Sequence, residues 1–238
     1  MNTSYQKIND DLSSALDLQK PLVALTFVDK PPEGSAIFEG ESPSLCQFWR
    51  DAESHVFFAS KDKHMNCPIG AMVMGFELPD EKQKELELLI NQMCNSSYLD
   101  PEEASKIPSI SDGKAGILYG PLKEFPIEPQ IVLMWLTPYQ TMIFNEAMGS
   151  CKWNSGLKTM DLGRPGCAII PTTLQNSQNS MSFGCIGMRT FTEIKPEFAL
   201  SAMPFNNLEK LIKDLKITNL ANKAMEKYYR DQKKKYSN

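Results

Sequence analysis

Short runs of β-branched and aromatic residues recur along the chain and predict strands. Each run is bounded by turn-forming or charged residues, which is typical of strands in a folded sheet. The five runs lie at 22–28, 55–59, 116–119, 130–136 and 198–203. We therefore expect these segments to form a central sheet.

Helices are predicted where capping residues precede apolar residues at helical spacing. Ser42 followed by Pro43 is expected to begin one helix, with serine as the N-cap and proline in the first turn. Other starts have the spacing of a capping box, in which residues three apart satisfy each other's free backbone N–H groups. These pairs are Asp80 with Gln83, Thr137 with Gln140, and Asn206 with Glu209. Helices and strands alternate only loosely, so the predicted fold class is α+β (mixed α/β), a single domain with a mixed central sheet and packed helices.

Composition and charge narrow the class of protein. The 238 residues are 42% hydrophobic and 23% charged, as in ordinary globular proteins. A formal net charge of −4 argues against nucleic acid as the main partner, because phosphate binding needs a cationic surface. The first residues contain no apolar stretch after a basic start, so we expect no secretory signal. The longest apolar run, 131–136, is far below the about 20 residues that cross a bilayer, so we expect a cytoplasmic protein that is not in the membrane.

Most familiar catalytic motifs are absent from the sequence. The chain has no GxxxxGKS/T, GxGxxG, HExxH or GxSxG motif, which argues against the common nucleotide-binding and hydrolase classes. With only His55 and His64, a site with three histidine ligands cannot form. Whether the protein is an enzyme stays open at this stage.

The six cysteines are therefore the main candidates for chemistry, and no two of them form a CxxC pair. Cys67 directly precedes Pro68, which predicts an N-cap where the free N–H groups of a helix favour a thiolate. Cys46 is expected in the first turn of the helix that begins near Ser42. Cys94 resembles a small buried apolar residue near the end of a helix, and Cys151 lies in an ambiguous position.

Two further cysteines lie beside glycine and arginine residues. Cys167 follows a turn that contains Arg164, and Cys185 lies between two glycines, shortly before Arg189. Glycine lets the backbone approach a bound group closely, and arginine can hold an anionic substrate. Arg164 and Arg189 are therefore candidate anion-binding residues.

Several segments resemble a known family. The segments are CQFWRDA around Cys46, CPIGA from Cys67, YGPL at 119–122, VLMWLTPYQTM at 132–142 and GCIGMR around Cys185. Together they resemble the family called domain of unknown function 169, which is common in anaerobic bacteria and archaea and has no settled reaction. The resemblance covers about 22–215 of a single domain 1–238, with a C-terminal helical tail at 216–238.

The family pattern implies a set of four cysteines. Its cysteines match Cys46, Cys67, Cys167 and Cys185, with glycines beside the second and fourth. The second motif often reads Cys-Pro-Gly-Gly in the family, whereas this chain has Ile69 at the first of those glycines. Cys94 and Cys151 match nothing in the pattern.

Four cysteines on separate segments match the ligand number of a 4Fe-4S cluster or of a tetrahedral zinc ion. The cluster is favoured because structural zinc usually takes its ligands as close pairs in the sequence. The leading hypothesis is thus a 4Fe-4S cluster-binding protein of redox or electron-transfer type, with an electron-transfer protein as its expected partner. Zinc is the alternative metal, and a homo-oligomer is left open.

Two alternatives do not need a metal. One is a non-enzymatic protein that binds a small molecule or a tetrapyrrole-like ligand in an apolar pocket. Its wall would come from Met65, Met72, Met74, Trp135 and Met142. The other is a thiol redox switch with Cys67 as the reactive thiol.

Overall fold

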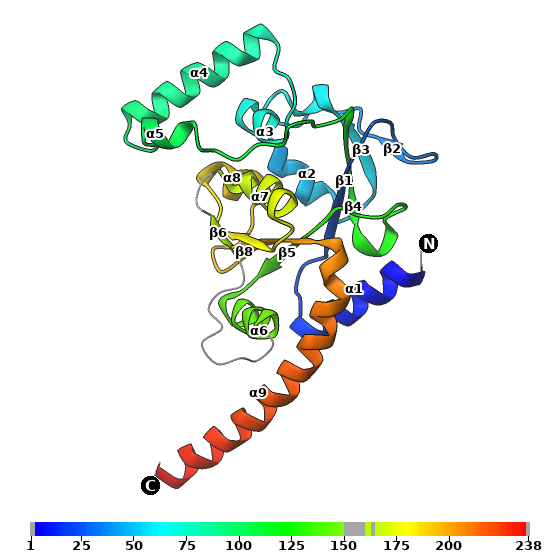
Figure 1. Ribbon diagram of the computed structural model, residues 1–238, viewed down its shortest axis with the longest axis vertical. Helices are drawn as coiled ribbons and strands as arrows, with labels where there is room; N and C mark the ends of the chain where they lie inside the picture. The colour runs from blue at the N-terminus through cyan, green and yellow to red at the C-terminus, as the bar shows by residue number, and fades with distance from the viewer. Residues whose placement is uncertain (1–2, 150–159, 163–164, 237–238) are drawn as a thin grey trace.

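A computed structural model of the chain describes residues 3–149, 160–162 and 165–236. Its strands are β1 Val23–Val28, β2 Ala36–Ile37, β3 Phe57–Ser60, β4 Gly116–Pro121, β5 Ile131–Leu136, β6 Met160–Leu162, β7 Ser180–Ser182 and β8 Ala199–Pro204. They form one sheet in the order β2-β3-β4-β1-β5-β8-β7-β6 (Figure 1). β2 with β3 and β6 with β7 are parallel pairs, and the other neighbours are antiparallel. The predicted α+β class with a mixed sheet is confirmed.

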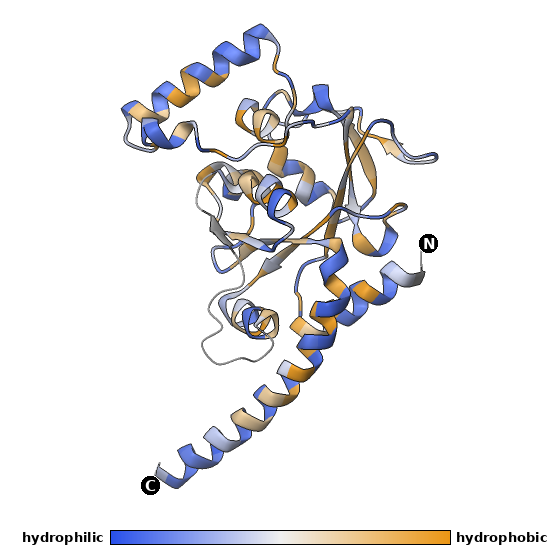
Figure 2. Cartoon of the chain, in the orientation of Figure 1, coloured by the Kyte–Doolittle hydropathy of each residue, from blue (hydrophilic) through white to orange (hydrophobic). Residues whose placement is uncertain are grey.

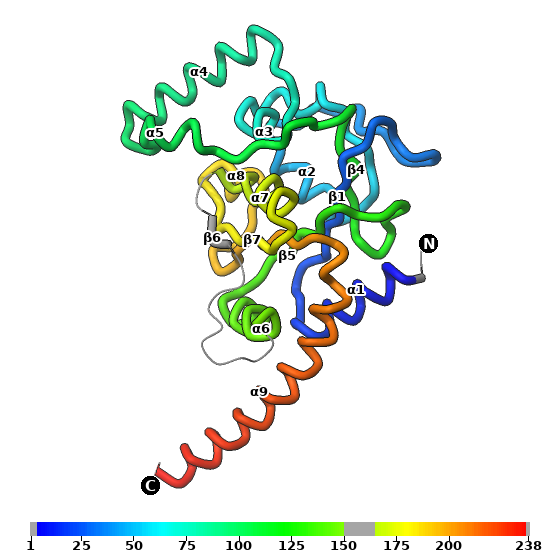
Figure 3. The backbone as a smooth tube through the Cα atoms, in the orientation of Figure 1, coloured from blue at the N-terminus to red at the C-terminus, as the bar shows by residue number. Residues whose placement is uncertain are grey.

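The helices lie before, between and after these strands along the chain, with three of them, α3 to α5, in succession between β3 and β4 (Figure 3). They are α1 Thr3–Leu16, α2 Leu45–Asp51, α3 Pro68–Val73, α4 Asp80–Asn95, α5 Pro101–Ala104, α6 Pro138–Met148, α7 Ile169–Asn176, α8 Ile186–Thr192 and α9 Leu208–Tyr236. Short 3-10 turns connect several elements, namely η1 Lys61–His64, η2 Leu122–Glu124, η3 Gly166–Ala168 and η4 Phe205–Asn207.

Helices cover both faces of the sheet. Because successive side chains of a strand point to opposite faces, Val23 and Leu25 of β1 join one core cluster and Ala24 joins the other. The first cluster also contains buried residues of α2, α3, α7 and α8, and the second contains those of α1, α6 and α9. All four cysteines of the predicted set belong to the first layer or pack against it.

The helix starts agree with the sequence prediction only in part. α6 has the predicted capping box: the Thr137 side chain accepts from the backbone N–H of Gln140, and the Thr137 backbone N–H donates to the Gln140 side chain at 2.8 Å. α2 begins two residues later than expected, with Ser44 rather than Ser42 as its N-cap. α4 has Pro79 as its N-cap and makes no side-chain capping bond, so the predicted capping box at Asp80 is wrong.

Two helical segments extend away from the sheet (Figure 2). α9 is buried along its first turns through Thr218, and its second half is exposed. The boundary at 216 expected for a C-terminal tail therefore lies inside one continuous helix. The α4–α5 hairpin projects from the opposite end, beside α3 (Figure 1). None of the helices in the described ranges is long and apolar enough to cross a membrane.

Candidate functional site

The four cysteines of the predicted set line a single cavity of about 450 Å³. Cys46 lies in the first turn of α2, Cys67 directly before α3, Cys167 in η3 before α7, and Cys185 directly before α8. Their sequence positions span 140 residues, so the fold rather than local spacing brings them together. Cys94 lies on α4 and does not line the cavity, and Cys151 lies outside the described residues.

Local backbone geometry turns two of these cysteines toward the cavity. Cys67 is the N-cap of α3 with Pro68 at the start of the helix, as the sequence predicts. Cys185 is the N-cap of α8, and its sulfur accepts a hydrogen bond from the backbone N–H of Met188 at 3.4 Å. The sulfur of Cys67 accepts hydrogen bonds from the backbone N–H groups of Leu45 and Gly70.

Gly70 is required by this close packing. A Cβ atom at Gly70 would lie 2.8 Å from the Cβ of Leu45 and 2.9 Å from the sulfur of Cys67, closer than real side chains approach. Gly187, beside Cys185, is less constrained, because a Cβ there would meet only the Cys185 sulfur, at 3.9 Å. The first of these glycines therefore sets the distance between the α2 and α3 segments.

Burial governs the protonation of the thiols. It raises the pKa of Cys46 and Cys167 well above the ordinary value, and it also raises the pKa of Cys67. The negative charges that neighbouring cysteines of the set would carry as thiolates raise the pKa of these three thiols further. The expectation of a thiolate at Cys67 is therefore wrong for the metal-free chain, because desolvation outweighs the N–H groups that face its sulfur.

A buried histidine and tyrosine lie behind the cysteines. His64 Nδ1 donates to the backbone oxygen of Ser60 at 2.9 Å, so its Nε2 accepts from the Tyr119 hydroxyl at 3.0 Å. Burial lowers the pKa of His64 to about 4. Burial, followed by the charges that Cys46 and Cys167 would carry, raises the pKa of Tyr119 well above its ordinary value. Sequence reasoning gave neither residue a role in the site, and the only signal was the position of Tyr119 in the YGPL motif.

Arg189, for which the sequence predicts anion binding, contacts backbone oxygens of neighbouring loops. Its guanidinium donates to the backbone oxygens of Phe183 at 2.8 Å, Phe198 at 3.0 Å and Lys195 at 3.4 Å. These bonds tie the segments before and after α8 to the helix. Arg189 does not line the cavity. Its donors are occupied because the loops on both sides of α8 fold back over it. Arg164 lies outside the described residues.

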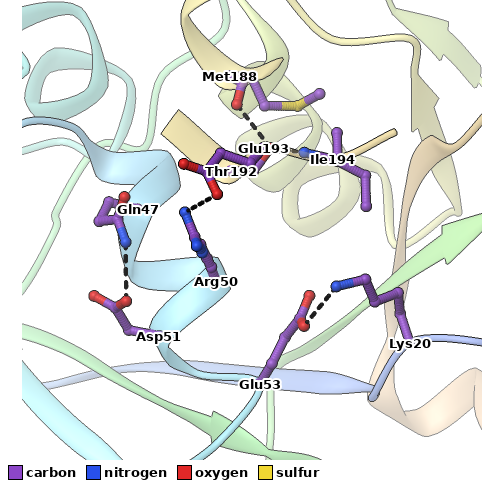
Figure 4. A network of polar contacts seen from close by, with 9 residues as sticks. All are labelled: Lys20, Gln47, Arg50, Asp51, Glu53, Met188, Thr192, Glu193 and Ile194. Carbon is purple, nitrogen blue, oxygen red and sulfur yellow. Dashed lines mark hydrogen bonds and ion pairs between the residues drawn. The ribbon is translucent and has the colours of Figure 1, made fainter. Parts of the chain in front are cut away.

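α8 packs against α2, and one exposed ion pair joins the end of α8 to α2 (Figure 4). Arg50 of α2 forms an ion pair with Glu193 at 2.8 Å. Glu193 ends α8 in a left-handed backbone conformation with φ 52°, which turns the chain sharply there. The hydroxyl of Thr192 donates to the backbone oxygen of Met188 at 2.8 Å and closes the last turn.

The pocket wall predicted from methionine and tryptophan is wrong for this cavity. Met74 and Trp135 belong to the core, Met65 and Met72 pack against it, and Met142 lines a second pocket beside α6. The apolar lining of the cysteine cavity comes largely from α4, the segment after it, and α8. It includes Leu89, Ile90, Met93, Leu99, Ile107, Ile186 and Phe191.

The cysteines surround the cavity without forming a compact coordination sphere. Within the described ranges, no three histidine, cysteine, aspartate or glutamate side chains converge tightly enough to be a metal-binding group by geometry alone. A zinc site would need its sulfurs at about 2.3 Å from one point. The four cysteine side chains on this cavity are nevertheless the donor set that either a cluster or a zinc ion would use.

Comparisons with known proteins cover most of the chain, including the cavity cysteines. An uncharacterised protein of Methanocaldococcus jannaschii, MJ0308, is 26% identical over 218 residues, which cover 84% of this chain and 89% of that protein. No solved structure matched the chain. The family domain of unknown function 169, described as uncharacterised ArCR, matches residues 11–214, which include all four cavity cysteines. The chain belongs to this family.

Proposed function

We propose that the protein binds a 4Fe-4S cluster through Cys46, Cys67, Cys167 and Cys185 and works in redox chemistry or electron transfer. The observation that carries this proposal is that four cysteines from four separate segments line one cavity. Four thiolates are the usual ligand set of such a cluster. When bound, the cluster would supply one-electron chemistry.

The surroundings of the sulfurs support this choice. Backbone N–H groups donate to the sulfurs of Cys67 and Cys185, and hydrogen bonds of this kind tune the potential of iron-sulfur clusters. The cavity walls are mostly apolar and limit the access of water to a bound group. Zinc is the second metal to test, because the donor set alone would also suit it.

Metal binding must displace protons in this site. Cys46, Cys67 and Cys167 have raised pKa values in the metal-free chain, so they hold protons at neutral pH. Ligation requires thiolates and therefore releases these protons. The raised pKa of Cys67 also gives no support to a redox switch that depends on a reactive thiolate at this position.

The test is iron and acid-labile sulfide analysis of protein purified without oxygen. We expect roughly four irons per unaltered chain and a dithionite-sensitive absorbance band near ~400 nm. Replacing each cavity cysteine by serine should lower the iron content, whereas Cys94→Ser should leave it unchanged. Iron-free protein, or equal iron in all five variants, would refute the cluster. Zinc in place of iron would support the alternative metal.

A further inference from the structure

We propose that the cysteine cavity also binds an uncharged, mainly apolar small molecule between the cysteines and the α4–α5 hairpin. This proposal extends the proposed function by naming a class of molecule that would lie beside the cluster, and only the presence of the cluster rests on that function. The evidence comes from the wall of the cavity that α4 and the segment after it form, which carries no cysteine.

The cavity has two largely apolar walls, and only one of them carries cysteines. That wall holds the four cysteines and residues of α2, α3 and α8. The other consists of residues from α4 and the segment that follows it, namely Leu89, Ile90, Gln92, Met93, Ser96, Tyr98, Leu99 and Ile107. A cluster held by the first wall would have no ligand on the second. The second wall can therefore contact a second ligand.

Its apolar side chains lie on one face of α4. Leu86, Leu89, Ile90 and Met93 follow the i, i+3, i+4, i+7 spacing of an amphipathic helix. Leu86 is buried, but Leu89 and Met93 belong to neither core cluster nor to the residues that pack against one. Leu88, on the outer face of the same helix, is 70% exposed. The inner face thus presents apolar surface to the cavity rather than to the core.

The lining determines the charge of the ligand. Among the described residues that line the cavity, none is aspartate, glutamate, lysine, arginine or histidine. An anion bound there would lose its hydration without gaining a cationic side chain as a partner, which is strongly unfavourable. A few uncharged polar groups, including Gln92 and Ser96, can orient a ligand by hydrogen bonds.

The size of the cavity favours a small molecule over a protein partner. The whole cavity has a volume of about 450 Å³, of which a bound cluster would occupy a part, and it falls within the usual range of roughly 300–1,000 Å³ for small-molecule sites. Such sites are mostly apolar with a small number of polar groups, as this one is. Both walls come from the same chain, so no second chain is needed to form the cavity.

The first experiment measures binding of the neutral dye N-phenyl-1-naphthylamine to the full chain by equilibrium dialysis, since the absorbance of a cluster would disturb fluorescence. We expect 1-octanol to displace the dye and octanoate, at a pH where it is ionised, to displace it at least about tenfold more weakly. Equal displacement by the two competitors, or no dye binding, would overturn the proposal. This comparison uses the unaltered chain and does not depend on the folding of any variant.

Matched variants locate the site on the hairpin. Leu89→Glu and Met93→Glu place a carboxylate in the cavity wall and should weaken dye binding at least about tenfold, whereas Leu88→Glu should leave it unchanged. Circular dichroism checks that each variant is folded. Equal dye affinity in Leu88→Glu and in the two wall variants would contradict the proposal. A second result would also contradict the proposal: no dye binding, together with a change of oligomeric state in the two wall variants. That result would indicate a protein interface.

Iron analysis separates this proposal from the proposed function. The hairpin supplies no cysteine to the cavity, so Leu89→Glu and Met93→Glu should retain the iron content of the unaltered chain. Dye binding with the expected variant pattern in iron-free protein would refute the cluster and support the ligand site. Full iron content without dye binding would refute the ligand site and support the cluster.

Discussion

Acid is expected to destabilise the protein through His64. The side chain is 1% exposed, and its neutral form donates to the Ser60 backbone oxygen and accepts from the Tyr119 hydroxyl. A proton added to Nε2 would remove the acceptor that the Tyr119 hydroxyl uses and would place a charge in the core. The folded state therefore resists protonation that the unfolded chain accepts.

The size of this effect follows from the two pKa values. The pKa of His64 falls from 6.5 in the unfolded chain to about 4 in the folded protein. Between these values the unfolded state binds more protons, so stability falls as the pH falls from about 6.5 to about 4. Above this window the contribution is fully present, and below it no further loss arises from this residue. A difference of about 2.5 pKa units, at about 1.36 kcal/mol each, corresponds to about 3 kcal/mol.

Urea denaturation of the metal-free chain at several pH values between about 4 and 8 measures this loss. His64→Phe keeps an aromatic ring between Phe48 and Phe76 but cannot take up a proton. It should lower stability at neutral pH and reduce the pH dependence in the acid window by about 3 kcal/mol. His55→Phe, at an exposed position, should keep the original pH dependence. The same pH dependence in His64→Phe as in the unaltered chain would refute the reasoning.

Three further predictions concern the site and the C-terminal helix. Gly70→Ala should lower the free energy of unfolding by about 1–3 kcal/mol in urea denaturation, because the new Cβ meets Leu45 and the Cys67 sulfur, and it should also lower the iron content. Gly187→Ala should change the free energy of unfolding by less than about 0.5 kcal/mol. Similar losses in both variants would contradict this. Residues 223–236 are almost entirely exposed, so removing 223–238 should leave the midpoint of thermal unfolding within about 2 °C of its original value. A larger fall would show that this segment stabilises the fold. Chelation of bound metal should lower the thermal midpoint and yet leave a cooperative transition, and the absence of such a transition would show that the core depends on the metal.

The long strands and the capped helix were predictable because their signals are local. The five runs of β-branched and aromatic residues became β1, β3, β4, β5 and β8, with ends shifted by only one or two residues. β2, β6 and β7 were missed, since two or three residues are too few to show a strand pattern. The N-terminal α1 was also missed, although its buried residues recur at helical spacing.

Helix starts were harder to place because several polar residues compete for each cap. Ser42 and Ser44 both precede α2, and only the contacts show which one caps it: the Ser42 hydroxyl donates to the Ser44 backbone oxygen at 2.9 Å, and Ser44 faces Gln47. At α4, Asp80 has the right spacing but already lies inside the helix. Spacing alone cannot separate these cases.

The residue types of the candidate site were predictable from the sequence, but its environment was not. Cys46, Cys67, Cys167 and Cys185 stood out by their neighbours and by the family resemblance. The sign of the pKa change at Cys67 depended on burial, which local sequence does not reveal, and the helix start by itself indicated the opposite direction. Arg189 stood next to the site in sequence, but the loops around α8 take up its donors. The cavity wall on α4 carried no motif at all.

The wide spacing of the cysteines bears on the order of folding and metal binding. Cys67 and Cys167 are 100 residues apart in sequence, so a metal ion that joined them in an unfolded chain would have to close a very long loop. In the folded protein, each cysteine lies on a segment that packs into the same core layer of the sheet, and that layer is built from apolar residues. Small zinc domains differ, because their closely spaced ligands let the metal supply most of the folding free energy. Here the core can form first and bring the four cysteines around the cavity, and metal binding then displaces the protons that Cys46, Cys67 and Cys167 hold.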